Sequence, residues 1–136
     1  MASTLDLAGI KKPDHVQFNS LMPLIAGKKK SNYNAIYGTY KPNDQRMVTE
    51  GDYKLIMYPN IKKTKLFNLK TDPKEMKNLA TDKKNAPIIA GLFKTFNKLQ
   101  KETGDTLKVE ASEYSAKGIA YKPAPRKPRK KKQKKQ

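Results

Sequence analysis

The sequence predicts an α+β fold, in which a small antiparallel sheet of about four strands is covered by one long helix. Short segments rich in aromatic and aliphatic residues follow one another between residues 33 and 69, with connections too short for parallel crossovers. Residues 87–100 repeat apolar side chains at helical spacing. A chain of 136 residues with 36% hydrophobic content fits one modest core and leaves part of the chain outside it. The helix stripe must cover something, and the half-apolar sheet is the largest candidate.

The first thirty residues predict short elements only. Residues 4–10, TLDLAGI, are typical of the last turns of an amphipathic helix that ends near Gly9. Because so short a helix is marginal in water, we expect it to be the end of a larger structural unit, so that the chain begins partway through that unit. Residues 18–25, FNSLMPLI, are apolar enough to be buried, and Pro23 favours a short helix or an irregular packed segment.

The sheet is predicted from four segments, with a turn at residues 41–44 after the first of them. Gly38 indicates a bulge or a close approach of two backbones. The polar linker Thr49-Glu50-Gly51-Asp52 contains a glycine able to take positive φ, as hairpins require. The predicted strands are residues 33–40, 45–48, 53–58 and 65–69.

The segments after the sheet predict two helices. Thr71-Asp72-Pro73 is typical of a capped helix start, so we expect a brief helix that runs through Ala80. The second helix, at residues 87–100, ends at Gly104 and is expected to cover one face of the sheet. The side chains predicted to lie beneath it are Tyr53, Leu55, Leu66 and Phe67.

Charge is concentrated at the C-terminal end. Thirty Lys and Arg residues against twelve Asp and Glu give a net charge of +18, which makes polyanions the expected electrostatic partners. Residues 122–136 hold nine of the basic residues and no acidic residue, and the region 110–136 is predicted to be a flexible Lys/Arg-rich tail. The candidate polyanion contacts are Arg126, Lys127, Arg129, Lys130, Lys131, Lys132, Lys134 and Lys135.

The residues do not predict an active site within this chain. There is no cysteine, and the one histidine, His15, lies in a polar link where solvent exposure is expected. The aspartates are scattered through turns and caps without the spacing of a calcium loop. We therefore predict no catalytic, cofactor-binding or metal-binding residue here. With no visible signal peptide or membrane span, the chain as written is expected to be cytoplasmic.

Several motifs taken together resemble the C-terminal end of the sulfatase family, nearest to its choline-sulfatase-like and arylsulfatase members. The motifs are TLDLAGIKKPD, SLMPLI, YNAIYGTY, GDYKLIMYP and KLFNLKTDPKEMKNLATD, followed by the helix at residues 87–100. Asn68 stands where the family often has Asp. The match covers roughly residues 4–109, and its specificity comes from the order of the pieces.

The resemblance implies a C-terminal subdomain over residues 31–109, preceded at residues 1–30 by the end of a catalytic domain and a linker. It implies that the formylglycine nucleophile and the calcium site of the family lie in a domain absent from this sequence, and full-length members are often exported. The expected partner is a catalytic domain from the same or a split gene. The chain alone is expected to be inactive in sulfate ester hydrolysis. The alternative is a small basic protein that binds nucleic acid or other polyanions through its tail.

Overall fold

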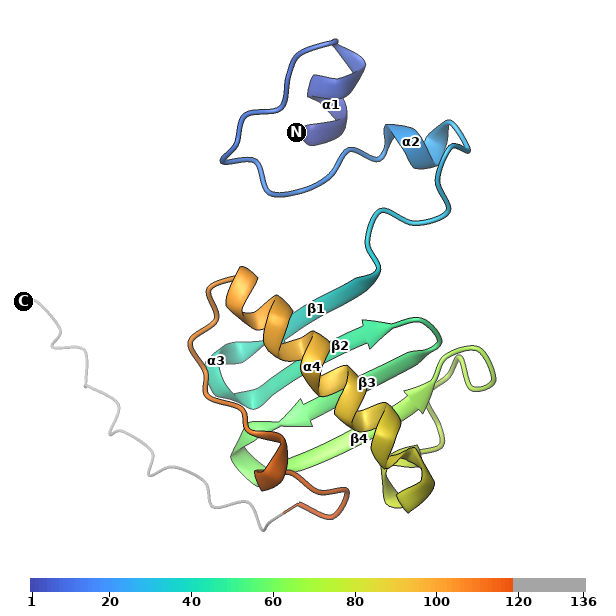
Figure 1. Cartoon of the computed structure of the whole chain (residues 1–136), viewed down its shortest axis with the longest axis vertical. Helices are drawn as coiled ribbons and strands as arrows, with labels where there is room; N and C mark the ends of the chain where they lie inside the picture. The colour runs from blue at the N-terminus through green and yellow to red at the C-terminus, as the bar shows by residue number, and fades with distance from the viewer. Residues whose placement is uncertain (119–136) are drawn as a thin grey trace, which may run out of the picture.

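The computed structural model describes residues 1–118 and shows a sheet-and-helix body below a smaller lobe made by residues 1–34 (Figure 1). The sheet is covered on one face by α4, and this arrangement confirms the predicted α+β class. The strands are β1 (Ala35–Tyr40), β2 (Gln45–Glu50), β3 (Tyr53–Tyr58) and β4 (Lys63–Asn68). The helices are α1 (Ala2–Leu7), α2 (Met22–Ile25), α3 (Lys41–Asp44) and α4 (Ala86–Glu102), with short 3-10 turns η1 (Pro59–Ile61), η2 (Leu79–Thr81), η3 (Lys83–Asn85) and η4 (Ala111–Glu113).

The four strands form an antiparallel meander in the order β1-β2-β3-β4. The β2–β3 hairpin turns at Gly51 and Asp52, and Gly51 has φ +56°, which a residue with a side chain rarely adopts. Gly38 lies opposite Met47, whose side chain would be 2.8 Å from an added Cβ. The close contact at Gly38 is therefore with a side chain and not with a second backbone as predicted, and the register there runs without a bulge.

The core lies between the sheet and α4. Val48, Leu55, Met57 and Leu66 are fully buried on the covered face, and Phe96 of α4 is fully buried against them. Leu92, Phe93 and Val109 complete the cluster. The predicted stripe on α4 is therefore the element that closes the core.

The prediction for Phe67 is wrong. Its cross-strand partner is Lys54, whereas the buried Leu66 pairs with Leu55. Paired residues share a face, and neighbours along a strand lie on opposite faces. Phe67 is therefore buried on the face away from α4, where Ile56 is also buried.

Two local predictions also need correction. The expected helix between Thr71 and Ala80 is replaced by a loop that ends in η2, because Asp72 accepts hydrogen bonds from the amides of Met76 and Lys77 and Glu75 takes φ +55°. Both features turn the backbone away from the helical path. The turn expected at residues 41–44 forms the single helical turn α3.

Residues 110–118, which the sequence assigned to the tail, contact the body of the fold. Ser115 pairs with the edge of β4: its carbonyl accepts from the Thr64 amide, and its own amide donates to the Lys62 carbonyl. The ring of Tyr114 lies 6.1 Å from that of Phe93, centroid to centroid. The predicted boundary at residue 110 thus falls inside a packed segment, while residues 119–136 lie outside the described part of the chain.

Polar contacts join the segments of the lobe. The Leu21 amide donates to the Ser3 hydroxyl at 2.9 Å, and the Ser20 hydroxyl donates to the Asp6 carboxylate at 2.6 Å. Gly9 ends α1 with φ +69°, as the sequence predicts. Within residues 1–118, no helix combines the length and the apolar character needed to cross a bilayer.

Candidate functional site

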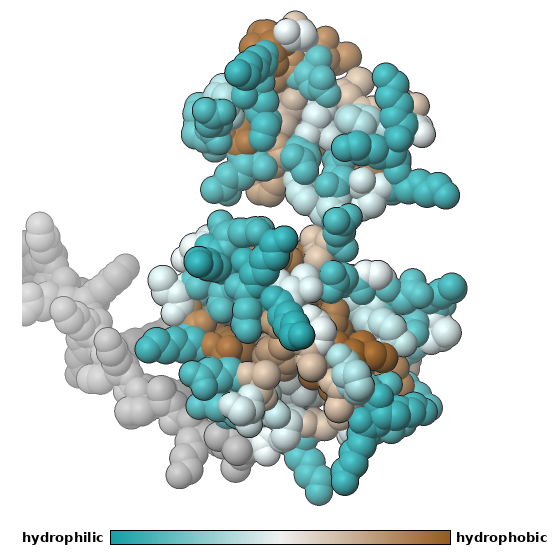
Figure 2. Space-filling model, viewed as in Figure 1, coloured by the Kyte–Doolittle hydropathy of each residue, from teal (hydrophilic) through white to brown (hydrophobic). Residues whose placement is uncertain are grey.

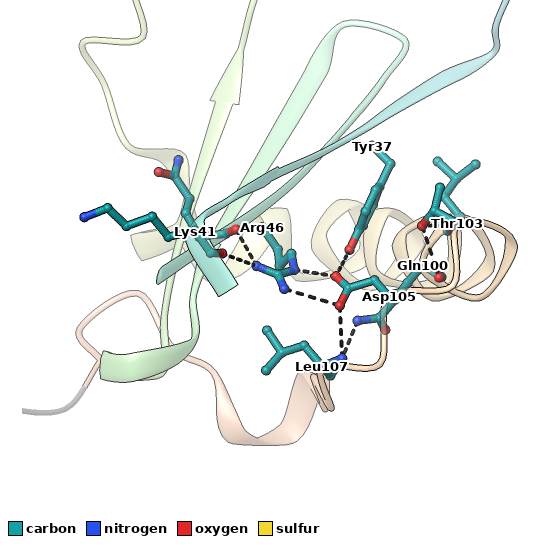
Figure 3. Close-up of polar contacts among 9 residues, drawn as sticks. Tyr37, Lys41, Arg46, Gln100, Thr103, Asp105 and Leu107 are labelled. Carbon is teal, nitrogen blue, oxygen red and sulfur yellow. Dashed lines mark hydrogen bonds and ion pairs between the residues drawn. The ribbon is translucent and has the colours of Figure 1, made fainter. Parts of the chain in front are cut away.

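One buried polar cluster stands out at the C-terminal end of α4, where Arg46, Asp105 and Tyr37 converge (Figure 3). Arg46 comes from β2, Tyr37 comes from β1, and Asp105 follows the helix. Arg46 is 4% exposed, so its charge has been removed from water and requires a partner inside the fold.

The end of α4 places Asp105 in this cluster. Gly104 takes φ +71°, and the amides of Gly104 and Asp105 donate to the carbonyls of Lys101 and Gln100. This is the Schellman arrangement of a helix C-terminus, which reverses the chain immediately after the last turn. The reversal directs the Asp105 carboxylate back toward β1 and β2 (Figure 3).

The carboxylate of Asp105 accepts from three residues. Arg46 Nε donates to Oδ2 at 2.5 Å and Nη2 donates to Oδ1 at 3.3 Å, so the guanidinium engages both oxygens. The Tyr37 hydroxyl also donates to Oδ2, and the Leu107 amide donates to Oδ1 at 3.0 Å. Arg46 Nη1 completes the network through the carbonyls of Gln45 at 2.9 Å and Lys41 at 3.2 Å.

The electrostatics fix the protonation of all three side chains. Hydrogen bonds from Arg46 hold the pKa of the Asp105 carboxyl well below its usual range, and the bond to Asp105 raises the pKa of Arg46. Burial, with the hydrogen bond to Asp105, raises the pKa of Tyr37 far above its ordinary value. None of these groups exchanges a proton near neutral pH, so the cluster is unsuited to general acid–base catalysis.

A polar cleft of about 550 Å³ lies beside this cluster and is lined by Tyr37, Thr39, Lys41, Arg46 and Thr103 to Asp105. It offers hydroxyls and cations but no cysteine, and no serine lies in its wall. The polar atoms of Arg46 and Asp105 bind one another and the nearby backbone. The cluster is therefore a clamp that fixes the end of α4 to the first two strands.

The residues singled out from the sequence do not gather into a second site. His15 is exposed, as predicted, in the link between α1 and α2. Among residues 1–118, no three His, Cys, Asp or Glu side chains come close enough to hold a metal ion, so this part of the chain does not fit the calcium ion of the sulfatase family. The eight candidate polyanion contacts from Arg126 to Lys135 lie outside the described residues.

The comparison with protein families matches residues 1–102 to the family described as N-sulphoglucosamine sulphohydrolase, C-terminal. This range includes the lobe, the sheet and all of α4. The chain is also similar to the Delta 4,5-hexuronate-2-O-sulfatase of Bacteroides thetaiotaomicron, with 33% identity over 117 residues that cover 78% of this chain and 24% of that protein.

Solved structures show the same fold. A 2-O GAG sulfatase superposes with a TM-score of 0.63 at 30% identity, and the match covers 80% of this chain and 26% of that one. A second structure, solved with its substrate D-glucosamine-2-N,6-O-disulfate, gives a TM-score of 0.64 at 22% identity over 77% of this chain and 24% of that one. The chain therefore spans about a quarter of the length of the proteins it matches.

Proposed function

This chain belongs to the sulfatase family, whose C-terminal part it matches, and we propose that it acts as a bracing subdomain without catalytic residues of its own. In this proposal the whole enzyme hydrolyses sulfate esters. The similarity to a hexuronate-2-O-sulfatase supports a sugar as the group that carries the ester. The formylglycine and the calcium ion belong in this proposal to the remaining three quarters of the enzyme.

The observation that carries the proposal is the chemistry of the clamp. Its carboxylate, guanidinium and phenol are held in single protonation states, and the carboxylate is occupied by donors from three residues. Such a cluster stabilises the meeting point of α4, β1 and β2 and leaves no free nucleophile or base. The function that fits it is support for a catalytic domain.

An assay of sulfate ester hydrolysis tests this proposal directly. The purified 136-residue chain is incubated with an aryl sulfate and added calcium, and a full-length sulfatase serves as the positive control. We expect no release of the aryl alcohol above the rate of a blank without protein. Turnover that copurifies with the chain and is lost when the chain is removed would refute the proposal.

A second candidate function rests on the charge of residues 122–136, which hold nine basic residues and no acidic one. We propose that this segment binds nucleic acid or another polyanion through phosphate or sulfate contacts, without reading base sequence. The hypothesis is independent of the sulfatase fold, because it depends on charge alone.

Retention on nucleic acid across a salt series tests the second candidate. The full chain and a variant that ends at Tyr121 are compared at increasing salt concentration. We expect weaker retention and a shallower salt dependence for the shortened variant, because fewer counterions are released when it binds. Equal retention of the two proteins would remove this role from the segment.

A further inference from the structure

Exposed apolar side chains are confined almost entirely to one part of the described chain. Of the ten large hydrophobic side chains that are exposed within residues 1–118, nine lie in residues 1–40. The exception is Met76, in the loop after β4. The nine are Met1, Leu7, Ile10, Phe18, Leu21, Ile25, Tyr33, Ile36 and Tyr40. Such a concentration marks an interaction surface, whereas scattered single residues would need no explanation.

The lobe does not bury these side chains itself. Among residues 1–34, only Ala2 and Val16 are buried, and both have small side chains. Figure 2 shows hydrophobic side chains at the surface of the upper lobe between hydrophilic ones. Phe18 is 76% exposed, although burying an aromatic side chain of this size gives one of the larger gains available to a fold.

A groove of about 570 Å³ joins the lobe to the body of the fold. Its walls include Val16 and Phe18 from the lobe, Ile36 from β1 and Leu99 from α4. Phe18 and Ile36 are both more than half exposed, so the apolar part of the groove is open to solvent. The groove thus connects the exposed lobe to the outer strand of the sheet.

The two edge strands of the sheet differ in whether another segment of the described chain covers them. The β4 edge is covered, because Ser115 bonds to the backbone at Lys62 and Thr64, and the Asn78 side chain accepts from the Leu66 amide at 3.0 Å. Within residues 1–118, no segment other than β2 pairs with β1. The sequence of β1, AIYGTY, has no charge or proline to discourage pairing. An open apolar edge is a site where another chain can pack.

We propose that the β1 edge and the adjoining groove, with Phe18 and Ile36 as anchors, form the surface that docks onto the catalytic domain of a sulfatase. This inference rests on the proposed function and adds the location of the contact. By its register Ile36 lies on the sheet face away from α4, so the docking surface includes the β1 part of that face and leaves out its β3 and β4 parts, where Lys54 and Lys65 lie.

Length identifies the occupant of this surface. The chain matches about a quarter of each related sulfatase, so three quarters of such an enzyme remain to contact it. The family match runs through residues 1–102 and therefore includes the lobe and β1, which shows that the lobe belongs to the unit that sulfatases carry. A second copy of the chain or an anionic membrane would be the competing occupant, and the experiment separates these cases.

The experiment uses the Bacteroides thetaiotaomicron 2-O-sulfatase without the quarter that this chain matches. That tagged protein is coexpressed with the full 136-residue chain, and the captured chain is quantified. We expect the wild-type chain to be captured, and Phe18→Ser combined with Ile36→Ser to reduce capture at least about tenfold. Met76→Ser is the matched control, since Met76 is 81% exposed and lies elsewhere; its capture should equal that of the wild type.

The outcomes separate the two proposals. Equal capture of the wild type and the double variant would overturn the docking surface and leave the bracing function intact. Capture of the relative's own missing quarter, but not of this chain, would also overturn the docking proposal. Light scattering and sedimentation with anionic vesicles provide independent readouts on the chain alone. If the wild type and Met76→Ser form dimers or bind vesicles and the double variant does not, the surface binds a second copy or a membrane. Either result would also overturn the docking proposal.

Discussion

Removing the Asp105 carboxylate is the most direct test of the clamp at the end of α4. The side chains of Arg46 and Asp105 are only 5% and 15% exposed, so Asp105→Ala leaves a buried guanidinium without its countercharge. Breaking one partner of a buried pair costs about 3–5 kcal/mol. The Tyr37 hydroxyl and the Leu107 amide lose an acceptor in the same step. Because a natural domain has about 5–15 kcal/mol of stability in total, a loss of this size is readily measured.

Urea denaturation followed by circular dichroism at neutral pH measures this loss. A double variant, Arg46→Met with Asp105→Ala, should lose less stability than Asp105→Ala alone, because it leaves no unpaired buried charge. Asp52→Asn is the control, since Asp52 is exposed in the hairpin turn and should change stability by less than about 0.5 kcal/mol. A change for Asp105→Ala as small as that of the control would refute the reasoning.

The same clamp predicts an acid dependence. The Asp105 pKa is depressed in the folded state, chiefly by hydrogen bonds from Arg46, while an unfolded aspartate titrates near its ordinary value of about 3.9. Its contribution is therefore complete above about pH 5 and is lost as the pH falls toward the folded pKa. Below pH 4 the wild type should lose about 1.4 kcal/mol per pH unit more than Asp105→Ala. Equal slopes for the two proteins in acid denaturation would contradict this assignment.

Three further substitutions test the core, the covered edge of β4 and the packing of residues 110–118 against the body. Phe96→Ala should cost about 3–5 kcal/mol in urea denaturation because Phe96 is fully buried, whereas Lys98→Ala on the exposed face of α4 should change little. Asn78→Ala removes the acceptor for the Leu66 amide and should cost about 1–3 kcal/mol; a smaller effect would show that water replaces the side chain. Gly118→Ala places a Cβ 2.5 Å from a backbone oxygen at φ +70°, so amide exchange in residues 113–116 should accelerate, and unchanged exchange would refute the packing of this segment.

The sheet and α4 could be predicted because their signals are local. Helical spacing and a cap identify α4, and short polar links identify the hairpins. The face of each side chain in β4 could not be predicted in the same way. Leu66 and Phe67 are adjacent and both apolar, so the pattern does not say which one faces the helix. The register with β3 decides it, and a shift of one residue exchanges the two faces.

The clamp could not be predicted because its contacts are distant in sequence. Arg46 and Asp105 are separated by 59 positions. The glycine at position 104 indicates that the chain reverses after α4, but no local pattern states which strand the next residue meets. In the sequence Asp105 is one of several scattered aspartates, and only the tertiary fold distinguishes it from them by placing a buried arginine against it.

The body buries most of its apolar side chains and pairs its buried charge, whereas the lobe leaves large apolar side chains exposed. This difference indicates where a partner would contact the chain. In the body, α4 closes one face of the sheet, the clamp pairs the buried charge, and residues 110–118 cover the β4 edge. The lobe leaves Leu7, Phe18 and Ile25 more than 70% exposed. A partner that covered α4 or the β4 edge would gain little apolar burial, whereas one that packed against the lobe and β1 would remove exposed apolar side chains from water. The energetics of association therefore favour the lobe side of the molecule.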